Sequence, residues 1–195
     1  MATIYITNNR AIFRNALSTN FHVAIPTANN GVDDKFSLSI TVPKSDKRTI
    51  EDINQLMEHI RIKNSDMLRG QDNIVPKLSE LLTPLKDDDK RASFNPTYKN
   101  TFYLVARSKE APGIVEPDLE AIAPSEIVNG IYGGVSVTFK AYNIDGRRGI
   151  SAHLDNIQKL RDAITAPVKP TVAEDFGEDF EADDDRSSSF DGFED

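Results

Sequence analysis

Three stretches of this sequence alternate apolar with other residues at a period of two, the pattern of half-buried β-strands. They are Lys35–Val42, Thr101–Arg107 and Gly134–Tyr142. Because successive side chains of a strand point to opposite faces, each stretch offers one face to a core and one to solvent. Thr3–Thr7 and Arg10–Ala16 show the same pattern more weakly. The chain is therefore constrained to build its core mainly from strands.

A single helix is predicted between the early strands and the later ones. An apolar stripe at helical spacing is formed by Ile50, Ile53, Leu56, Met57 and Ile60. Thr49 and Asp52, three residues apart, match a capping box at the start of this helix, and Gly70 is a candidate end.

Two further segments complete the pattern. Asn29-Asn30-Gly31 predicts a turn that joins Phe21–Ile25 to the strand at Lys35 as a hairpin. Gly149–Asp162 has apolar spacings that fit both a strand and a helix, and we expect a strand in its first half. The residues between Asn73 and Tyr98 are predicted to be mostly loop.

These elements predict a mainly β protein with an inserted helix, in which five strands form a small OB-fold-like barrel. Closing a sheet on itself removes the edges that an open sheet exposes. We expect residues 1–170 to form this domain and residues 171–195 to be a disordered acidic tail.

The charge is divided unevenly between these two parts. The whole chain has a net charge of −8, but Ala173–Asp195 holds eleven acids and one base, so the remainder carries +2. Like charges and scattered apolar residues keep such a tail from folding alone. A body without the tail would tolerate a polyanionic partner.

Several chemistries find no support in the sequence. The chain has no Cys, which excludes disulfides and thiolate metal sites, and no apolar run reaches the roughly 18 residues of a membrane helix. Phosphate-binding glycine motifs are absent. Ser151, His153 and Asp155 are the residue types of a catalytic triad, but at this spacing on a strand we expect them about 6–7 Å apart, too far for proton transfer. No catalytic residue, cofactor or metal is predicted.

An alternative uses the run Asp87-Asp88-Asp89, whose carboxylates are the ligand type that Mg²⁺ prefers. On that reading the protein is a metal-dependent nucleic-acid enzyme. Lys86, Lys90 and Arg91 flank the run, which favours a solvated loop instead.

Binding of single-stranded nucleic acid fits the solvent faces of the strands better. Such a binder needs a cationic groove for the phosphates and aromatic rings for the bases. Both residue types occur on the predicted outer faces and in the adjoining turns. The candidate contacts are Lys44, Tyr98, Lys99, Tyr103, Arg107, Lys140, Tyr142, Arg147 and Arg148.

The tail combines carboxylates with isolated phenylalanines. Its candidate partner-binding residues are Asp183, Asp184, Asp185, Phe190 and Phe193. A flexible segment of this kind is suited to occupy a cationic groove in place of a nucleic acid, or to dock on a basic pocket of another protein. A solubilising tail is the simpler alternative.

Three stretches also resemble a family of single-stranded-DNA-binding proteins of tailed bacteriophages, formerly catalogued as a domain of unknown function. They are KFSLSITVPKSD (Lys35–Asp46) with the helix after it, YKNTFYLVARSKEAPGIV (Tyr98–Val115), and the long Ile122–Asp162 segment. The resemblance implies an OB-fold that binds single-stranded DNA without strong sequence preference.

The resemblance also implies a role in phage DNA replication or recombination, in the cytoplasm of the infected bacterial host. Together with the residue pattern, it leads us to expect a non-catalytic protein that coats single-stranded DNA. Its acidic tail is expected to compete with DNA and to recruit replication or recombination proteins.

Overall fold

The computed structural model describes residues 3–22, 35–70, 73–87, 99–127 and 130–162. Its strands are β1 (Thr3–Thr7), β2 (Arg10–His22), β3 (Phe36–Pro43), β4 (Leu85–Asp87), β5 (Thr101–Ser108), β6 (Gly113–Val115), β7 (Ile131–Ile144) and β8 (Arg147–Asp162). Its helices are α1 (Lys47–Lys63), α2 (Ser65–Leu68) and the 3₁₀ turns η1 (Leu78–Glu80) and η4 (Pro124–Glu126). None of the helices in these ranges is long and apolar enough to cross a membrane.

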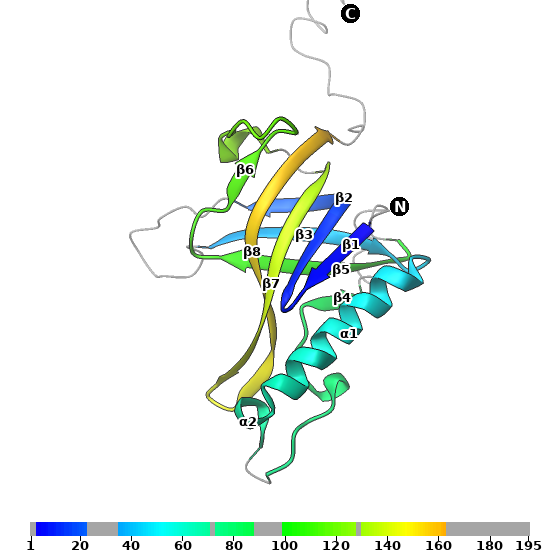
Figure 1. The fold of residues 1–195 in the computed structure, drawn as a ribbon, viewed down its shortest axis with the longest axis vertical. Coiled ribbons are helices and arrows are strands. Elements are labelled where there is room, and N and C mark those ends of the chain that lie inside the picture. The colour runs from blue at the N-terminus through cyan, green and yellow to red at the C-terminus, as the bar shows by residue number, and fades with distance from the viewer. Residues whose placement is uncertain (1–2, 23–34, 71–72, 88–98, 128–129, 163–195) are drawn as a thin grey trace, which may run out of the picture. The chain divides into compact units, whose positions relative to one another are not determined.

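Five strands form a closed ring in the order β5, β3, β2, β7, β8 and back to β5 (Figure 1). The first four contacts are antiparallel, and the ring closes where β5 meets β8 in parallel at Arg107 and His153. β1, β4 and β6 are added outside this ring. The mainly β architecture with an inserted helix is thus confirmed.

The core is filled from the faces that the alternation predicted to be apolar. Leu38, Ile40, Leu104, Val137 and Phe139 are all almost fully buried. The end of β2 pairs antiparallel with β3, as the predicted hairpin requires. Residues 23–25 of its first strand and its predicted turn lie outside the described residues. The predicted tail, residues 171–195, lies outside them too.

Helix α1 closes one side of the core with Ile53, Leu56, Met57 and Ile60, which are buried in the main apolar cluster. The predicted capping residue was wrong. Asp46 caps the helix, and its carboxylate accepts a hydrogen bond from the Thr49 backbone N–H at 3.2 Å. Asp46 and Thr49 are three residues apart, as are Thr49 and Asp52. The spacing alone therefore allowed the helix to be capped by either Asp46 or Thr49.

The ambiguous segment after Gly149 is strand along its whole length. β8 pairs with β7 along its whole length: Ile144 lies opposite Arg147 at one end, and Ile131 lies opposite Asp162 at the other. A two-residue turn joins the two strands (Figure 1). The turn residues, Asp145 and Gly146, have φ of 50° and 79°. Positive φ at both positions is the geometry that Asp-Gly supplies at tight hairpins.

Phe139 provides a test of this core, because its side chain is 1% exposed on the inward face of β7. We expect Phe139→Ala to lower the free energy of unfolding by about 3–5 kcal/mol through the cavity it leaves. Urea denaturation followed by circular dichroism measures the change. Lys140→Ala, at the exposed neighbouring position, is the control and should leave stability nearly unchanged; equal losses would contradict the assigned faces.

Candidate nucleic-acid interface

A groove of about 800 Å³ lies on the outer side of β4, β5, β7 and β8. Basic side chains dominate the charge of its lining. The cations are Lys35, Lys86, Arg107, Lys109 and Lys140, and Glu110 is the acidic residue among the lining side chains. A concave surface with this excess of positive charge attracts a polyanion more strongly than scattered surface lysines do.

The groove exists because β5 and β8 meet at one register position and then diverge. A short segment fills the space between them. Leu82 pairs with β8, since its N–H donates to the Arg148 carbonyl at 3.2 Å and its carbonyl accepts from Ile150 at 2.8 Å. Three residues later, β4 pairs with β5 instead. The segment thereby holds the two strands apart and forms part of the groove wall.

Tyr142 lies in the groove across from Gly149, its register partner on β8. A Cβ atom on Gly149 would come within 2.8 Å of the Tyr142 hydroxyl and would also collide with the backbone of Leu82. Gly149 therefore allows the tyrosine and Leu82 to approach β8 closely. This packing positions an aromatic side chain, half-buried, beside the basic residues.

His153 lies in the groove wall and connects β8 to β5. Its Nε2 is 3.3 Å from the Ser108 hydroxyl, and its Nδ1 is 3.2 Å from an oxygen of Asp155. The same carboxylate accepts from the Thr138 hydroxyl at 2.7 Å and lies 3.6 Å from Arg10 Nε. This network links four strands of the ring, β2, β5, β7 and β8, at the wall of the groove.

The expected separation of His153 from Asp155 was therefore wrong. A β-bulge lies between the Ser136 and Val137 pairings, and Asp155 is its extra residue. Bulges redirect side chains, which explains the contact with His153. Ser151 donates to the Lys140 carbonyl instead, and Ser108 takes its place beside the histidine. Ser108 is 4% exposed and accepts a hydrogen bond from the Glu110 backbone N–H. Ser108, His153 and Asp155 therefore have a structural role, in which they hold the groove wall in place.

Four of the nine predicted contact residues line the groove: Tyr103, Arg107, Lys140 and Tyr142. Arg107 and Lys140 are exposed, as their strand faces predicted. The prediction that Tyr103 is exposed to solvent was wrong, because the residue is only 8% exposed, although it does line the groove. β4 pairs with the edge of β5 and places Lys86 opposite Tyr103, a neighbour that the sequence pattern did not predict.

The other predicted contacts lie elsewhere. Lys44 forms an ion pair with Asp87, at 2.8 Å between Nζ and Oδ1, and its Nζ lies 5.4 Å from the centre of the Phe102 ring. Arg148 donates to the Leu68 carbonyl at 3.3 Å, so it ties β8 to α2 rather than facing solvent freely. Lys99 is exposed just before β5.

Arg147 lies at the β7–β8 turn and is exposed. Tyr98 and the five predicted tail residues (Asp183, Asp184, Asp185, Phe190, Phe193) lie outside the described residues.

Sequence reasoning missed three of the basic residues in the groove, Lys35, Lys86 and Lys109. Lys35 is the first residue of one predicted strand, and Lys109 lies two residues after the end of another. The pairing of Phe36 with Ser108 brings these two strand ends together. Lys86 was assigned to a solvated loop, whereas the structure places it on β4.

Asp87 is the described residue of the Asp87–Asp89 run. Both carboxylate oxygens of Asp87 are engaged by Lys44, at 2.8 and 2.9 Å, while Asp88 and Asp89 fall outside the described ranges. Across those ranges, no cluster of three His, Cys, Asp or Glu side chains could hold a metal ion.

Comparison with solved structures finds the same fold in phage proteins. The single-stranded DNA-binding protein from bacteriophage Enc34, in a C-terminal truncation, matches with a TM-score of 0.63 and 18% identity over 84% of this chain and 95% of that chain. The Enc34 protein in complex with single-stranded DNA matches with a TM-score of 0.63 and 17% identity over 84% and 96%.

A third structure, gp2.5, a single-stranded DNA binding protein encoded by bacteriophage T7, matches with a TM-score of 0.52 and 16% identity over 82% and 98%. A search of curated protein sequences returned no significant match. Residues 10–187 match the family model described as Enterobacter phage Enc34, ssDNA-binding protein. Because this match spans most of the sequence, the chain belongs to the family of the single-stranded-DNA-binding protein of Enterobacter phage Enc34.

Proposed function

We propose that this protein coats and protects single-stranded DNA during phage DNA replication or recombination, without catalysing a reaction itself. Membership of the Enc34 family supports single-stranded DNA as the ligand. The observation that carries the proposal is the groove, which five basic side chains and Tyr142 line together. We place this activity in the cytoplasm of the infected bacterial host.

The residues of the groove divide into two roles. Arg107, Lys140 and the other cations neutralise successive phosphates, which is a contact that every sequence offers. Tyr142 stacks against a base, and stacking is also tolerant of sequence because every base has a π-face. A binder built in this way covers whatever strand replication exposes.

The acidic tail gives the protein a second activity on this proposal. With eleven acids against one base, it competes electrostatically with DNA for the cationic groove. Once DNA displaces it, its carboxylates and phenylalanines are available to recruit replication or recombination proteins. The supporting observation is that the tail is negatively charged whereas the groove lining is positively charged.

The first prediction concerns salt. If four to six phosphates are neutralised, the logarithm of the binding constant for oligothymidine should fall with log salt at a slope of roughly −3 to −4. Arg107→Ala with Lys140→Ala should flatten this slope by about 1.4, since each phosphate contact contributes about 0.7. Fluorescence anisotropy over a salt series measures it.

Lys47→Ala with Lys63→Ala is the matched control, because it removes the same charge from α1, outside the groove.

Tyr142→Ala should weaken binding by roughly 1–3 kcal/mol at one salt concentration. Tyr132→Ala, on the same strand but outside the groove, should not. Equal effects of the paired variants, or a preference for duplex, would refute the assignment.

The second prediction concerns the tail. Truncation after Pro170 changes the net charge from −8 to +2. The truncated protein should bind single strands more tightly, most visibly at low salt, where screening is weak. It should also lose the ability to recruit replication proteins, measured as stimulation of synthesis on a coated template.

A second variant separates the two effects. Phe190→Ser with Phe193→Ser keeps every carboxylate, so it should keep the competition with DNA and lose recruitment. Unchanged affinity of soluble truncated protein at low salt would show that the tail does not compete for the groove.

A further inference from the structure

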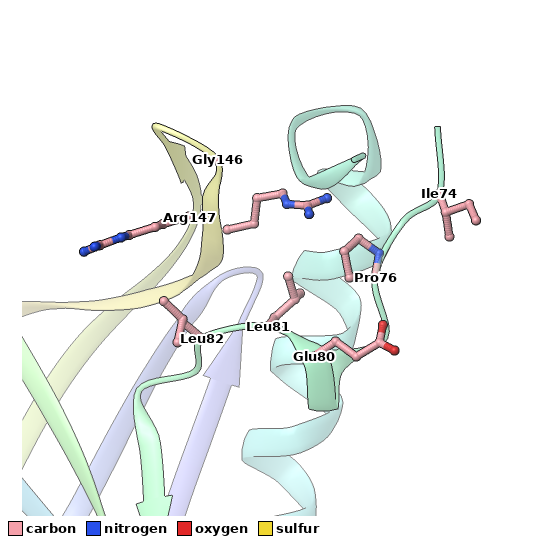
Figure 2. A pocket seen from close by; sticks show the side chains of 8 residues that line it. Ile74, Pro76, Glu80, Leu81, Leu82, Gly146 and Arg147 are labelled. Atoms are coloured by element: carbon pink, nitrogen blue, oxygen red, sulfur yellow. The ribbon is translucent and has the colours of Figure 1, made fainter. Parts of the chain in front are cut away.

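A second hollow, of about 560 Å³, lies next to the groove at the β7–β8 turn (Figure 2). One side is formed by the segment that leads into β4, and the other by the turn itself. The lining residues that carry the argument are Ile74, Pro76, Leu81, Leu82, Arg147 and Arg148. Its lining thus combines apolar side chains with two arginines.

The hollow adjoins the groove at Leu82, which lines both. The Leu82 backbone is fixed on β8 by its two hydrogen bonds, and its side chain is 53% exposed. Figure 2 shows Leu82 and Arg147 on one side of the hollow and Ile74 and Pro76 on the other. In this view the Arg147 side chain extends away from Ile74 and Pro76.

The wall of the hollow is held in place by α1. Arg61 donates to both carboxylate oxygens of Glu58, at 2.7 and 2.6 Å, and to the Pro76 carbonyl at 3.2 Å. The hydrogen bond from Arg61 lowers the pKa of the Glu58 carboxyl. The Arg148 guanidinium is held from the other side by the Leu68 carbonyl. A cavity with anchored walls costs little ordering when a ligand enters.

The chemistry of the lining fits a nucleotide. Ile74, 62% exposed, and Leu82 offer apolar surface to the face of a base. Within the described residues, the Arg147 side chain has no hydrogen-bond or ion-pair partner, so it is available to a phosphate. Glu80 is the acidic residue of the lining, and its carboxylate accepts the Lys77 backbone N–H at 2.8 Å.

We propose that this hollow is a second binding subsite, which takes the nucleotide or nucleotides of a single strand that continues beyond the groove. A base packs against Ile74, Pro76 and Leu82, and Arg147 binds an adjoining phosphate. The inference rests on the proposed function, because it extends the path of the same strand. It predicts that strands long enough to pass Leu82 bind more tightly than strands that fill the groove alone.

The test measures the affinity of the full chain for oligothymidines of about 4 to 16 nucleotides, the usual range of single-strand site sizes. Wild-type affinity should rise by about tenfold at the length that reaches the hollow, from one base packed on apolar side chains and one added phosphate contact. Ile74→Asp, which puts a carboxylate in the hollow, should abolish this rise and leave binding of the shorter strands unchanged.

Ile62→Asp is the matched control. Ile62 is 61% exposed, nearly the same as Ile74, and lies on α1 outside the lining of the hollow. It should keep the rise with length. Arg147→Gln, at an exposed turn position where misfolding is not expected, should reduce the rise and flatten the salt slope only for the longer strands.

The outcomes separate the two proposals. If Ile74→Asp keeps the rise, or loses affinity equally at every length, the subsite is refuted while single-strand binding by the groove stands. If the wild-type protein binds no oligothymidine of any length, the proposed function fails and the subsite fails with it.

Discussion

The contact between β5 and β8 at Arg107 and His153 determines most of what this protein presents to a ligand. It closes the ring of five strands, so residues 46 positions apart in the sequence lie side by side. Because the two strands pair at this position and then diverge, the Leu82–Asp87 segment fits between them. The groove, its basic lining and the neighbouring hollow all follow from this divergence.

The network beneath the groove stabilises the same contact. Ser108 on β5 and Asp155 on β8 both contact His153, and Thr138 on β7 joins through the carboxylate. Half-buried polar groups of this kind stabilise a fold only when their hydrogen bonds are satisfied, which the strand register and the bulge at Asp155 achieve here. The proposed binding surface is therefore held in place without DNA, so we expect binding to cost little conformational entropy there.

The strands and their inward faces could be predicted from the sequence because alternation is a local property. Phe139 and Lys140 fall on opposite faces whatever β7 pairs with. The groove was harder to predict, since its lining depends on which strands become neighbours. Tyr103 pairs with Lys86 of β4, and Lys44 forms an ion pair with Asp87. Both partners come from a stretch that the sequence pattern assigned to a loop. The contact of Asp155 with His153 depends on a bulge, for which the apolar pattern contains no signal.

The account claims that single-stranded DNA follows the groove across the β5–β8 contact. Titration of isotope-labelled full-length protein with oligothymidine, followed by amide NMR shifts, tests this directly. We predict that the largest shifts fall in Tyr103–Lys109 and in Lys140–His153, on both sides of the contact. Largest shifts in α1 and β1, with these two segments unchanged, would contradict it.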